Sequence, residues 1–161
     1  MITLAIIGLG TWGQRHVRSA RASGRFDLTV AVDPNAERAG PMAEELGLEL
    51  RPTLEDVLSD PGLQAISLAT PHTQHTGQII DAAAAGKHIY TEKPFALNAD
   101  DARKAVTAVE QAGVELALGH DQRFYPVMAK LTDLIKEKTL GRILHVETTL
   151  IHDSLLLPYR N

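Results

Sequence analysis

Ile2-Thr-Leu-Ala-Ile-Ile-Gly8-Leu-Gly10-Thr-Trp-Gly13 is the stretch of sequence that decides the fold of this chain. An apolar run of strand length leads directly into G-x-G-x-x-G, and a helical pattern follows. Gly8 permits a tight turn, Gly10 lets backbone approach a pyrophosphate closely, and Gly13 lets the helix pack on the strand. The helix would direct the free N–H groups of its first turn and the positive end of its dipole toward phosphates. The stretch therefore predicts a dinucleotide-binding strand, loop and helix.

A carboxylate stands where the second predicted strand ends. Residues 28–33 read Leu-Thr-Val-Ala-Val-Asp, so Asp33 closes this strand, 20 residues after Gly13. A carboxylate at this place binds the hydroxyl groups of the adenosine ribose. Because it would repel a 2′-phosphate, Asp33 favours NAD over NADP. The alternative interpretation is an unrelated strand–helix turn with an incidental aspartate.

Short aliphatic runs alternate with helical patterns through most of the chain. We predict strands over residues 2–7, 28–33, 64–69, 87–91 and 114–119, with a weaker strand near 48–51. Continuous apolar runs of this length are typical of strands that are covered on both faces. The alternation of strands and helices predicts an α/β fold, a Rossmann doubly wound parallel sheet.

The helices between these strands carry their own start and stop signals. Asn98 is the expected N-cap of one helix, with Asp101 at its third position, and Gly113 follows its last turn. Its predicted buried stripe consists of Ala102, Ala105, Val106 and Val109. Gly40-Pro41 predicts a break or kink in the second helix.

The pattern changes near the end of the chain. A helix is expected over residues 126–138, with Pro126 in its first turn and Val127, Leu131, Leu134 and Ile135 on one face. After Gly141 the apolar residues Leu144, Val146 and Leu150 alternate with His145, Glu147 and Thr149, which indicates a half-exposed strand. A lone strand does not stabilise itself, so residues 143–161 are expected to be frayed or paired with another chain.

We therefore divide the chain into two parts. Residues 1–125 are predicted to form an NAD-binding Rossmann domain. Residues 126–161 are predicted to form a connecting helix and the start of a truncated second α/β domain for substrate binding or oligomerisation.

Composition excludes several functional classes. The 161 residues amount to about one domain, and 44% hydrophobic with 22% charged residues is the composition of a globular protein that can bury a core. A formal net charge of −4 provides no broad field for nucleic acid or anionic membrane. The absence of cysteine from the sequence excludes disulfides and thiol nucleophiles.

No segment of the sequence reads as a signal peptide or a membrane span. The apolar run at residues 2–7 is too short and has no basic residue before it. Residues 61–80 carry no charged side chain, but two histidines, three glutamines and three threonines make them too polar for a bilayer core. We expect a cytoplasmic protein that has no membrane partner.

Histidines and arginines give no sign of a metal site or a nucleic-acid interface. His72 and His75 stand three residues apart at a predicted helix start, but no third ligand follows at a recognisable spacing. Arg15, Arg18 and Arg21 form a basic strip on one helix, which is the usual pattern of a solvated face. The sequence contains no G-x-S-x-G elbow of a serine hydrolase.

Three further segments follow predicted strands and should face the glycine loop. They are Ala69-Thr-Pro71-His72-Thr-Gln-His75, Thr91-Glu92-Lys93-Pro94 and Gly119-His-Asp-Gln-Arg123-Phe124. In their order and spacing, these segments and the glycine loop resemble the glucose–fructose oxidoreductase/inositol dehydrogenase/rhizopine catabolism (Gfo/Idh/MocA) family. The resemblance covers the nucleotide-binding half of such an enzyme.

The resemblance implies a role for Lys93. It makes Lys93 the catalytic lysine, beside the nicotinamide ribose and the reacting hydroxyl of a sugar, polyol or cyclitol. An ammonium there can polarise an alkoxide or carbonyl oxygen while hydride moves to or from the nicotinamide. The resemblance also implies a cis Lys93–Pro94 bond.

The resemblance assigns further residues to the cofactor and the substrate. Besides Gly8, Gly10, Gly13, Asp33 and Lys93, the predicted cofactor-binding residues are Thr11, Trp12, Thr70, Pro71, His75 and Glu92. His75 reads equally well as a packed, hydrogen-bonded histidine. Arg123 is expected near the substrate. The alternative interpretation of Arg123 is a structural ion pair with a carboxylate.

The family pattern also includes residues that this sequence does not contain. In the family a second α/β domain supplies an aspartate and a general acid/base histidine, whose positions lie beyond Asn161. His145 and His152 precede that motif and do not replace it. The full-length form is expected to be a homo-oligomer. The alternatives are a non-catalytic NAD-binding module or remnant, such as a sensor, and a relative of the NAD-dependent glycosidases.

Overall fold

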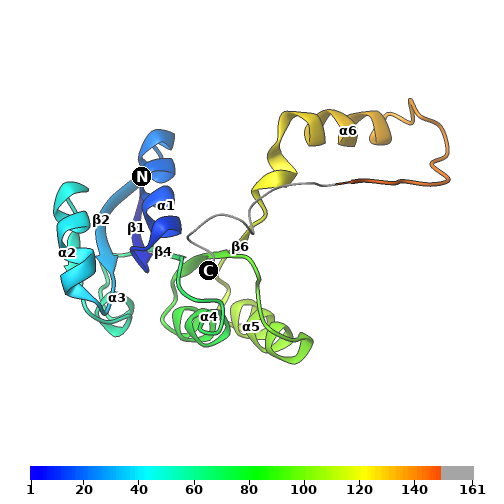
Figure 1. Cartoon of the computed structure of the whole chain (residues 1–161). Helices are drawn as coiled ribbons and strands as arrows, with labels where there is room; N and C mark the ends of the chain where they lie inside the picture. Colours follow the sequence, from blue (N-terminus) through cyan, green and yellow to red (C-terminus); the bar gives the residue numbers. More distant parts are fainter. Residues whose placement is uncertain (150–161) are drawn as a thin grey trace. The chain divides into compact units, whose positions relative to one another are not determined.

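A single parallel sheet organises most of the chain. The structure, a computed structural model, describes residues 1–149 (Figure 1). Met1–His120 form one unit, and the residues from Asp121 onward form a second. The sheet lies in the first unit and has the strand order β3-β2-β1-β4-β5-β6. All five strand pairs are parallel, which confirms the predicted doubly wound fold.

The strands coincide closely with the apolar runs of the sequence. Their bounds are β1 Ile2–Ile7, β2 Phe26–Val32, β3 Glu49–Arg51, β4 Ala65–Leu68, β5 His88–Glu92 and β6 Leu116–Gly119. β1 lies between β2 and β4, so successive connections leave it in opposite directions. In open α/β sheets ligands bind at this reversal, outside the carboxyl ends of the strands.

Helices cover both faces of the sheet. On one face lie α1 (Thr11–Ser23) and α2 (Ala36–Glu45), which bury Val17 and Ala39 against it. On the other face lie α3 (Glu55–Leu58), α4 (His75–Ala84) and α5 (Ala99–Ala112), and Figure 1 shows α4 and α5 side by side.

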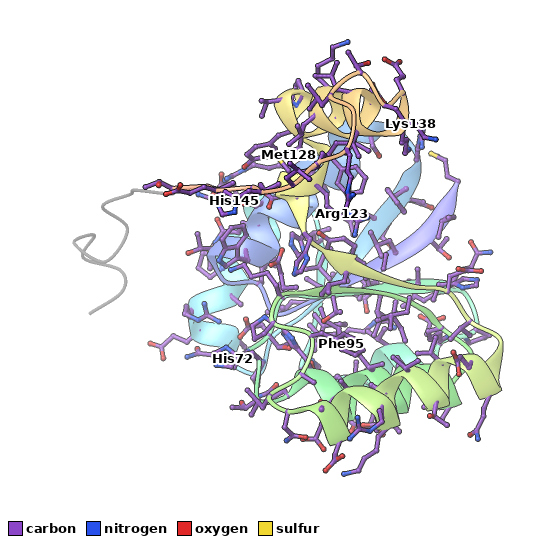
Figure 2. All side chains as sticks on the ribbon, turned by 90° about the vertical axis from the view of Figure 1, so that its right-hand side faces the viewer. His72, Phe95, Arg123, Met128, Lys138 and His145 are labelled. Atoms are coloured by element: carbon purple, nitrogen blue, oxygen red, sulfur yellow. The ribbon has the colours of Figure 1, made fainter. Side chains whose placement is uncertain are left out.

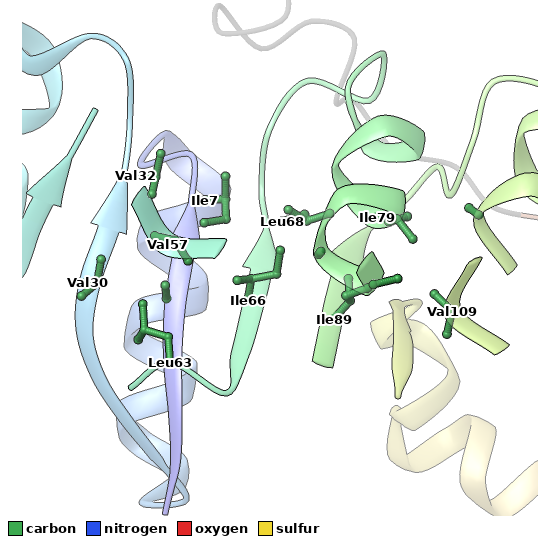
Figure 3. Close-up of a cluster of buried hydrophobic side chains, with 14 residues drawn as sticks. Ile7, Val30, Val32, Val57, Leu63, Ile66, Leu68, Ile79, Ile89 and Val109 are labelled. Carbon is green, nitrogen blue, oxygen red and sulfur yellow. The ribbon is translucent and has the colours of Figure 1, made fainter. Parts of the chain in front are cut away.

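Side-chain alternation along β1 divides the core into two clusters. Leu4 and Ile6 pack with α1 and α2, whereas Ala5 and Ile7 pack on the opposite face. Figure 3 shows the second cluster, where Ile79 of α4 approaches the sheet beside Leu68. Figure 2 shows Phe95 on this same side of the sheet, where it packs against the cluster. Burial on both faces explains why β1 reads as a continuous apolar run.

The caps of α5 are confirmed, but one member of its stripe is wrong. Asn98 Oδ1 accepts a hydrogen bond of 2.9 Å from the Asp101 amide, and Gly113 ends the helix in the left-handed conformation. Ala105 and Val109 are buried, one turn apart, but Val106 is 40% exposed. Val106 lies about 100° around the helix from Ala105, which places it outside the narrow face that meets the sheet.

The expected break at Pro41 does not occur. Helix α2 continues through this residue to Glu45. Proline removes a single N–H donor from the helix. The Asn35 side chain caps the first turn by accepting from the Arg38 amide at 3.0 Å, and Ala39 and Ala43 are buried on the sheet. These interactions hold the helix on both sides of the proline.

The described part of the second unit, residues 121–149, contains a short 3-10 helix and one α-helix. The 3-10 helix η1 spans Asp121–Phe124, and α6 spans Pro126–Lys136 with proline in its first turn, as predicted. Residues 142–149 form no strand, contrary to the period-2 pattern. A strand needs a partner, and none of the described residues pairs with this segment. Leu150 and His152 lie outside the described residues. Within residues 1–149, no helix is long and apolar enough to span a bilayer.

Candidate active site

A cleft opens at the carboxyl ends of the strands around β1. Its volume is about 640 Å³. Predicted residues in its lining are Gly8, Gly10, Asp33, Thr70 and Pro71. The loops that follow β1, β2 and β4 supply them. The fold thus brings together side chains and backbone that are up to 63 residues apart in the sequence.

The three loop glycines have different structural requirements. Gly8 has φ +91°, and a Cβ there would lie 2.9 Å from the carbonyl oxygen of Ala69. A Cβ on Gly13 would overlap the carbonyl oxygen of Gly8, so the close packing of α1 on the loop requires glycine. At Gly10 a Cβ would meet only Arg38 Nη1, at 3.9 Å. The packing of the chain itself therefore does not need glycine at position 10. The open space beside Gly10, here called the glycine cradle, is of the kind that suits a pyrophosphate.

The amino end of α1 faces this cradle. Gly10 is its N-cap, and among residues 1–149 no side chain caps this end. The first-turn N–H groups of an α-helix have no intrahelical acceptor, and here they belong to Thr11, Trp12 and Gly13. Free N–H groups and the positive end of the helix dipole make a suitable anion site.

Asp33 is held by three hydrogen bonds inside the cleft. Its side chain is 3% exposed. Oδ2 accepts from the Leu9 amide at 3.0 Å and from Arg38 Nη2 at 2.6 Å, and Oδ1 accepts from the Asn35 amide at 3.0 Å. Sequence reasoning missed Arg38, whose side chain is half exposed beside this carboxylate. The available signal was its position, five residues after Asp33 in the first turns of α2.

Lys93 lies beside the first turn of α1. Its Nζ is 5.3 Å from the centroid of the Trp12 ring, and the guanidinium carbon of Arg15 lies 4.7 Å from the same centroid. Cations at such distances are attracted to the face of an indole. Lys93 is exposed, and the Lys93–Pro94 bond is cis, as the family resemblance implies. An accessible ammonium thus stands next to the uncapped first turn of α1.

A polar chain lies behind Lys93. His16 Nε2 is 2.9 Å from Glu92 Oε1, and His16 Nδ1 is 2.9 Å from Ser67 Oγ. Glu92 Oε2 accepts a hydrogen bond of 3.2 Å from the backbone amide of Lys93. Burial is the largest single influence on the pKa of Glu92 and raises it, but hydrogen bonds and positive charge from His16 and Lys93 outweigh burial and lower the pKa below its ordinary value. Sequence reasoning missed His16 and Ser67.

His75 lies at the amino end of α4 and is almost fully buried. Its Nδ1 is 2.9 Å from the carbonyl oxygen of Pro94, and its Nε2 is 3.1 Å from that of Thr70. The ring therefore connects the loop after β4 with the loop after β5. Thr70 Oγ1 donates to Gln78 Oε1 at 2.6 Å. His75 supports the cleft wall from behind, which is the place of a packed, hydrogen-bonded histidine.

The remaining predictions concern Arg123 and metals. Arg123 belongs to η1 in the second unit. Its proposed contact with substrate stays a prediction. In the part of the chain that the structure describes, no three histidine or acidic side chains are grouped in a way that could hold a metal ion.

Known proteins resemble this chain in both sequence and fold. Residues 2–120 match the oxidoreductase family with an NAD-binding Rossmann fold, GFO_IDH_MocA. The scyllo-inositol 2-dehydrogenase (NAD(+)) of Bacillus subtilis is 34% identical over 88% of this chain and 42% of its own length. The rhizopine catabolism protein MocA of Rhizobium meliloti is 33% identical over 87% of this chain and 44% of its own.

Solved structures agree with the sequence matches. The WlbA dehydrogenase of Bordetella pertussis, solved with NADH and UDP-GlcNAcA, superposes with a TM-score of 0.82 at 29% identity, over 88% of this chain and 43% of that one. The chain spans about two fifths of the length of these relatives. Sequence, strand order and the glycine cradle thus agree: the chain belongs to the Gfo/Idh/MocA oxidoreductase family, and residues 2–120 are its NAD-binding Rossmann domain.

Proposed function

We propose that this chain is the nucleotide-binding half of an NAD-dependent oxidoreductase that acts on a hydroxyl group of a sugar, polyol or cyclitol. The observation that carries the proposal is the placement of Lys93. Its exposed ammonium lies 5.3 Å from the ring of Trp12, a residue in the first turn of the helix that follows the glycine cradle. The amino end of α1, which would bind the cofactor, and the exposed ammonium of Lys93 thus lie side by side.

The cleft supplies the groups that a dinucleotide requires. Gly10 leaves room for the pyrophosphate, and the N–H groups of Thr11 and Trp12 carry positive partial charge toward it. Asp33 presents a fixed carboxylate for the ribose hydroxyls. When bound, NAD supplies the nicotinamide ring that exchanges hydride with the carbinol carbon.

Lys93 is the residue that we assign to the chemistry. An ammonium donates hydrogen bonds and stabilises negative charge on oxygen, so it would bind the substrate oxygen and favour its alkoxide or carbonyl form. Trp12 and Glu92 limit where this side chain can lie, the first through its ring and the second through the Lys93 amide.

Support for the substrate class comes from the relatives. One is an enzyme named for scyllo-inositol oxidation with NAD, and another is a dehydrogenase solved with a nucleotide sugar. Both names describe hydroxylated rings. We extend this class of substrate, hydroxylated rings, to the present chain. The assay described next identifies the individual alcohol.

Hydride transfer tests the proposal. The protein that the native gene encodes is assayed with NAD and a panel of inositols, aldoses and linear polyols, with NADH absorbance as the readout. We expect activity on at least one member and a loss of about 10²-fold in kcat for Lys93→Met, as for removal of one oxyanion-stabilising donor. His72→Leu, an exposed change on another loop, is the control. NAD binding without hydride transfer to any member would favour a non-catalytic binding module instead.

A further inference from the structure

Two residues of α1 point toward the segment that carries Lys93. Trp12 and His16 are four residues apart, and residues at this spacing share one face of a helix. Trp12 contacts the Lys93 ammonium, and His16 contacts the carboxylate of Glu92. One helix therefore touches both the side chain of Lys93 and the residue that precedes it.

The contact between His16 and Glu92 is mostly buried. The His16 and Glu92 side chains are 12% and 13% exposed. The ring of Tyr90 meets the His16 ring edge to face, with 5.3 Å between centroids and 85° between planes. Ser67 Oγ lies 2.9 Å from the other ring nitrogen. The imidazole is thus fixed on three sides, by groups from β4 and β5.

The charge on the Glu92 carboxylate decides which ring nitrogen of His16 donates a hydrogen bond and which accepts one. The lowered pKa of Glu92 keeps it ionised at neutral pH, so both its oxygens only accept. His16 must then carry a hydrogen on Nε2 and donate it to Oε1. In the neutral ring this leaves Nδ1 as an acceptor for the Ser67 hydroxyl. Oε2 remains available for the amide of Lys93, at 3.2 Å.

We propose that His16 is a positioning residue that holds Lys93 in place through Glu92. The inference rests on the proposed function, in which Lys93 is the reacting ammonium. Within residues 1–149, the side-chain hydrogen bonds of His16 go to Ser67 and Glu92 rather than to Lys93, and His16 is not part of the cleft lining. His16 anchors the carboxylate of Glu92, which accepts from the Lys93 amide. The side chain of Lys93 therefore leaves the backbone in a direction that places its ammonium over Trp12.

The sole tryptophan of the sequence makes this proposal measurable. Trp12 fluorescence responds to the charge beside its ring, and Lys93→Met defines the spectrum without that ammonium. His16→Leu should change Trp12 emission in the same direction and by at least half as much. His16→Gln, whose amide can still donate to Glu92, should retain the wild-type emission. His72→Leu makes the same chemical change at an exposed site and should have no effect.

A second measurement needs no substitution of His16. Nitrogen-15 NMR of the imidazoles, at a pH where the ring is neutral, reports the tautomer of each histidine. We expect His16 in the Nε2–H form. In the Glu92→Leu variant, the one-bond coupling between Nε2 and its hydrogen should be lost. The Nδ1–H tautomer in the wild-type chain would overturn the proposal, as would a Trp12 spectrum that His16→Leu leaves unchanged while Lys93→Met alters it.

The two proposals fail in different ways. Absence of hydride transfer from every substrate would contradict the proposed function and leave the tautomer and emission results intact. An Nδ1–H tautomer in an enzyme that oxidises a polyol would instead contradict only the role of His16. If circular dichroism shows that His16→Leu does not fold, the tautomer measurement on the wild-type chain decides whether His16 has this role.

Discussion

Asp33 and Arg38 meet inside the cleft with opposite preferences for the two cofactors. A buried carboxylate repels a 2′-phosphate, whereas a guanidinium attracts one. Oδ2 of Asp33 and Nη2 of Arg38 are 2.6 Å apart, so each partly neutralises the other. We therefore expect a preference for NAD that depends on Asp33 and a residual affinity for NADP that depends on Arg38.

Replacing Asp33 tests the first half of this expectation. Asp33→Asn removes the charge and keeps the size of the side chain. The ratio of the dissociation constants for NADP and NAD should fall at least ~tenfold, equivalent to about 1.4 kcal/mol of lost repulsion. Calorimetric titration with each cofactor gives the ratio. Asp27→Asn makes the same change at an exposed position of β2, and an equal effect there would contradict the assignment.

Replacing Arg38 tests the second half. Arg38→Gln removes the guanidinium from the cleft, and NADP should bind about tenfold more weakly, as expected when a hydrogen bond to a charged group is lost. NAD affinity should change less than threefold because its adenosine ribose carries no 2′-phosphate. Arg18→Gln, on the exposed side of α1, is the matched control. An equal loss for both cofactors would refute a role in discriminating between them.

Glu92 makes the stability of the fold depend on acid. Because its pKa is lowered from the ordinary 4.5, the ionised carboxylate stabilises the fold above that pH, and this contribution is lost as the pH falls below it. Glu92→Gln should reduce the free energy of unfolding at pH 7 by about 1 kcal/mol, since the site is partly open to water. Urea unfolding at a series of pH values should show this difference narrowing below pH 4.5. Glu110→Gln, an exposed change on α5, should show neither effect.

The sequence predicts some site residues better than others for a physical reason. Gly8, Gly10 and Asp33 are fixed by local geometry at the ends of two strands, so their spacing alone is informative. His16 occupies a helical position that, in sequence, is indistinguishable from a solvated one, and the one sign of Arg38 is its place five residues after Asp33. Their partners stand 76 and 5 residues away, and only the docking of α1 and α2 on the sheet brings each pair together.

At the scale of elements, α1 depends on its contact with the glycine loop. Gly13→Ala places a methyl group against the carbonyl oxygen of Gly8, so the helix must shift from β1. We expect a loss of about 1–3 kcal/mol in the free energy of unfolding, the usual cost of overpacking. Urea denaturation measures it. Gly77→Ala, within α4 and with open space around its position, should instead stabilise the fold by about 0.5–1 kcal/mol. Equal effects of the two substitutions would refute the packing argument.

The elements also show where sequence patterns fail. Apolar runs predicted the central strands β1 and β4 well, because burial on both faces leaves little place for polar residues, whereas the edge strand β3, Glu-Leu-Arg with no fully buried residue, gave only a weak signal. The stripe of α5 was wrong at Val106, since periodicity indicates an apolar face but not how wide a face the sheet covers. The pattern at residues 144–149 indicates a strand, but strand formation also requires a partner, which the pattern does not specify.

At the scale of the whole molecule, the nucleotide-binding function lies within one unit. Met1–His120 include the complete sheet, the glycine cradle and Lys93. The family match ends at the same residue, His120. The division expected from the sequence after residue 125 lies five residues later, and the homo-oligomer of the full-length form stays a prediction. NAD binding should therefore depend on the first unit.

Calorimetric titration of the chain with NAD, on the wild type and on Gly10→Ala, tests the central claim most directly. Gly10 has φ −75°, which alanine adopts readily, and its Cβ would meet only Arg38. The variant should therefore fold normally, yet its methyl group should occupy the pyrophosphate cradle and weaken NAD binding at least ~tenfold. Gly77→Ala should bind NAD as the wild type does. A wild-type chain that does not bind NAD, or a Gly10→Ala variant that binds it with unchanged affinity, would contradict the assignment of this cleft to the cofactor.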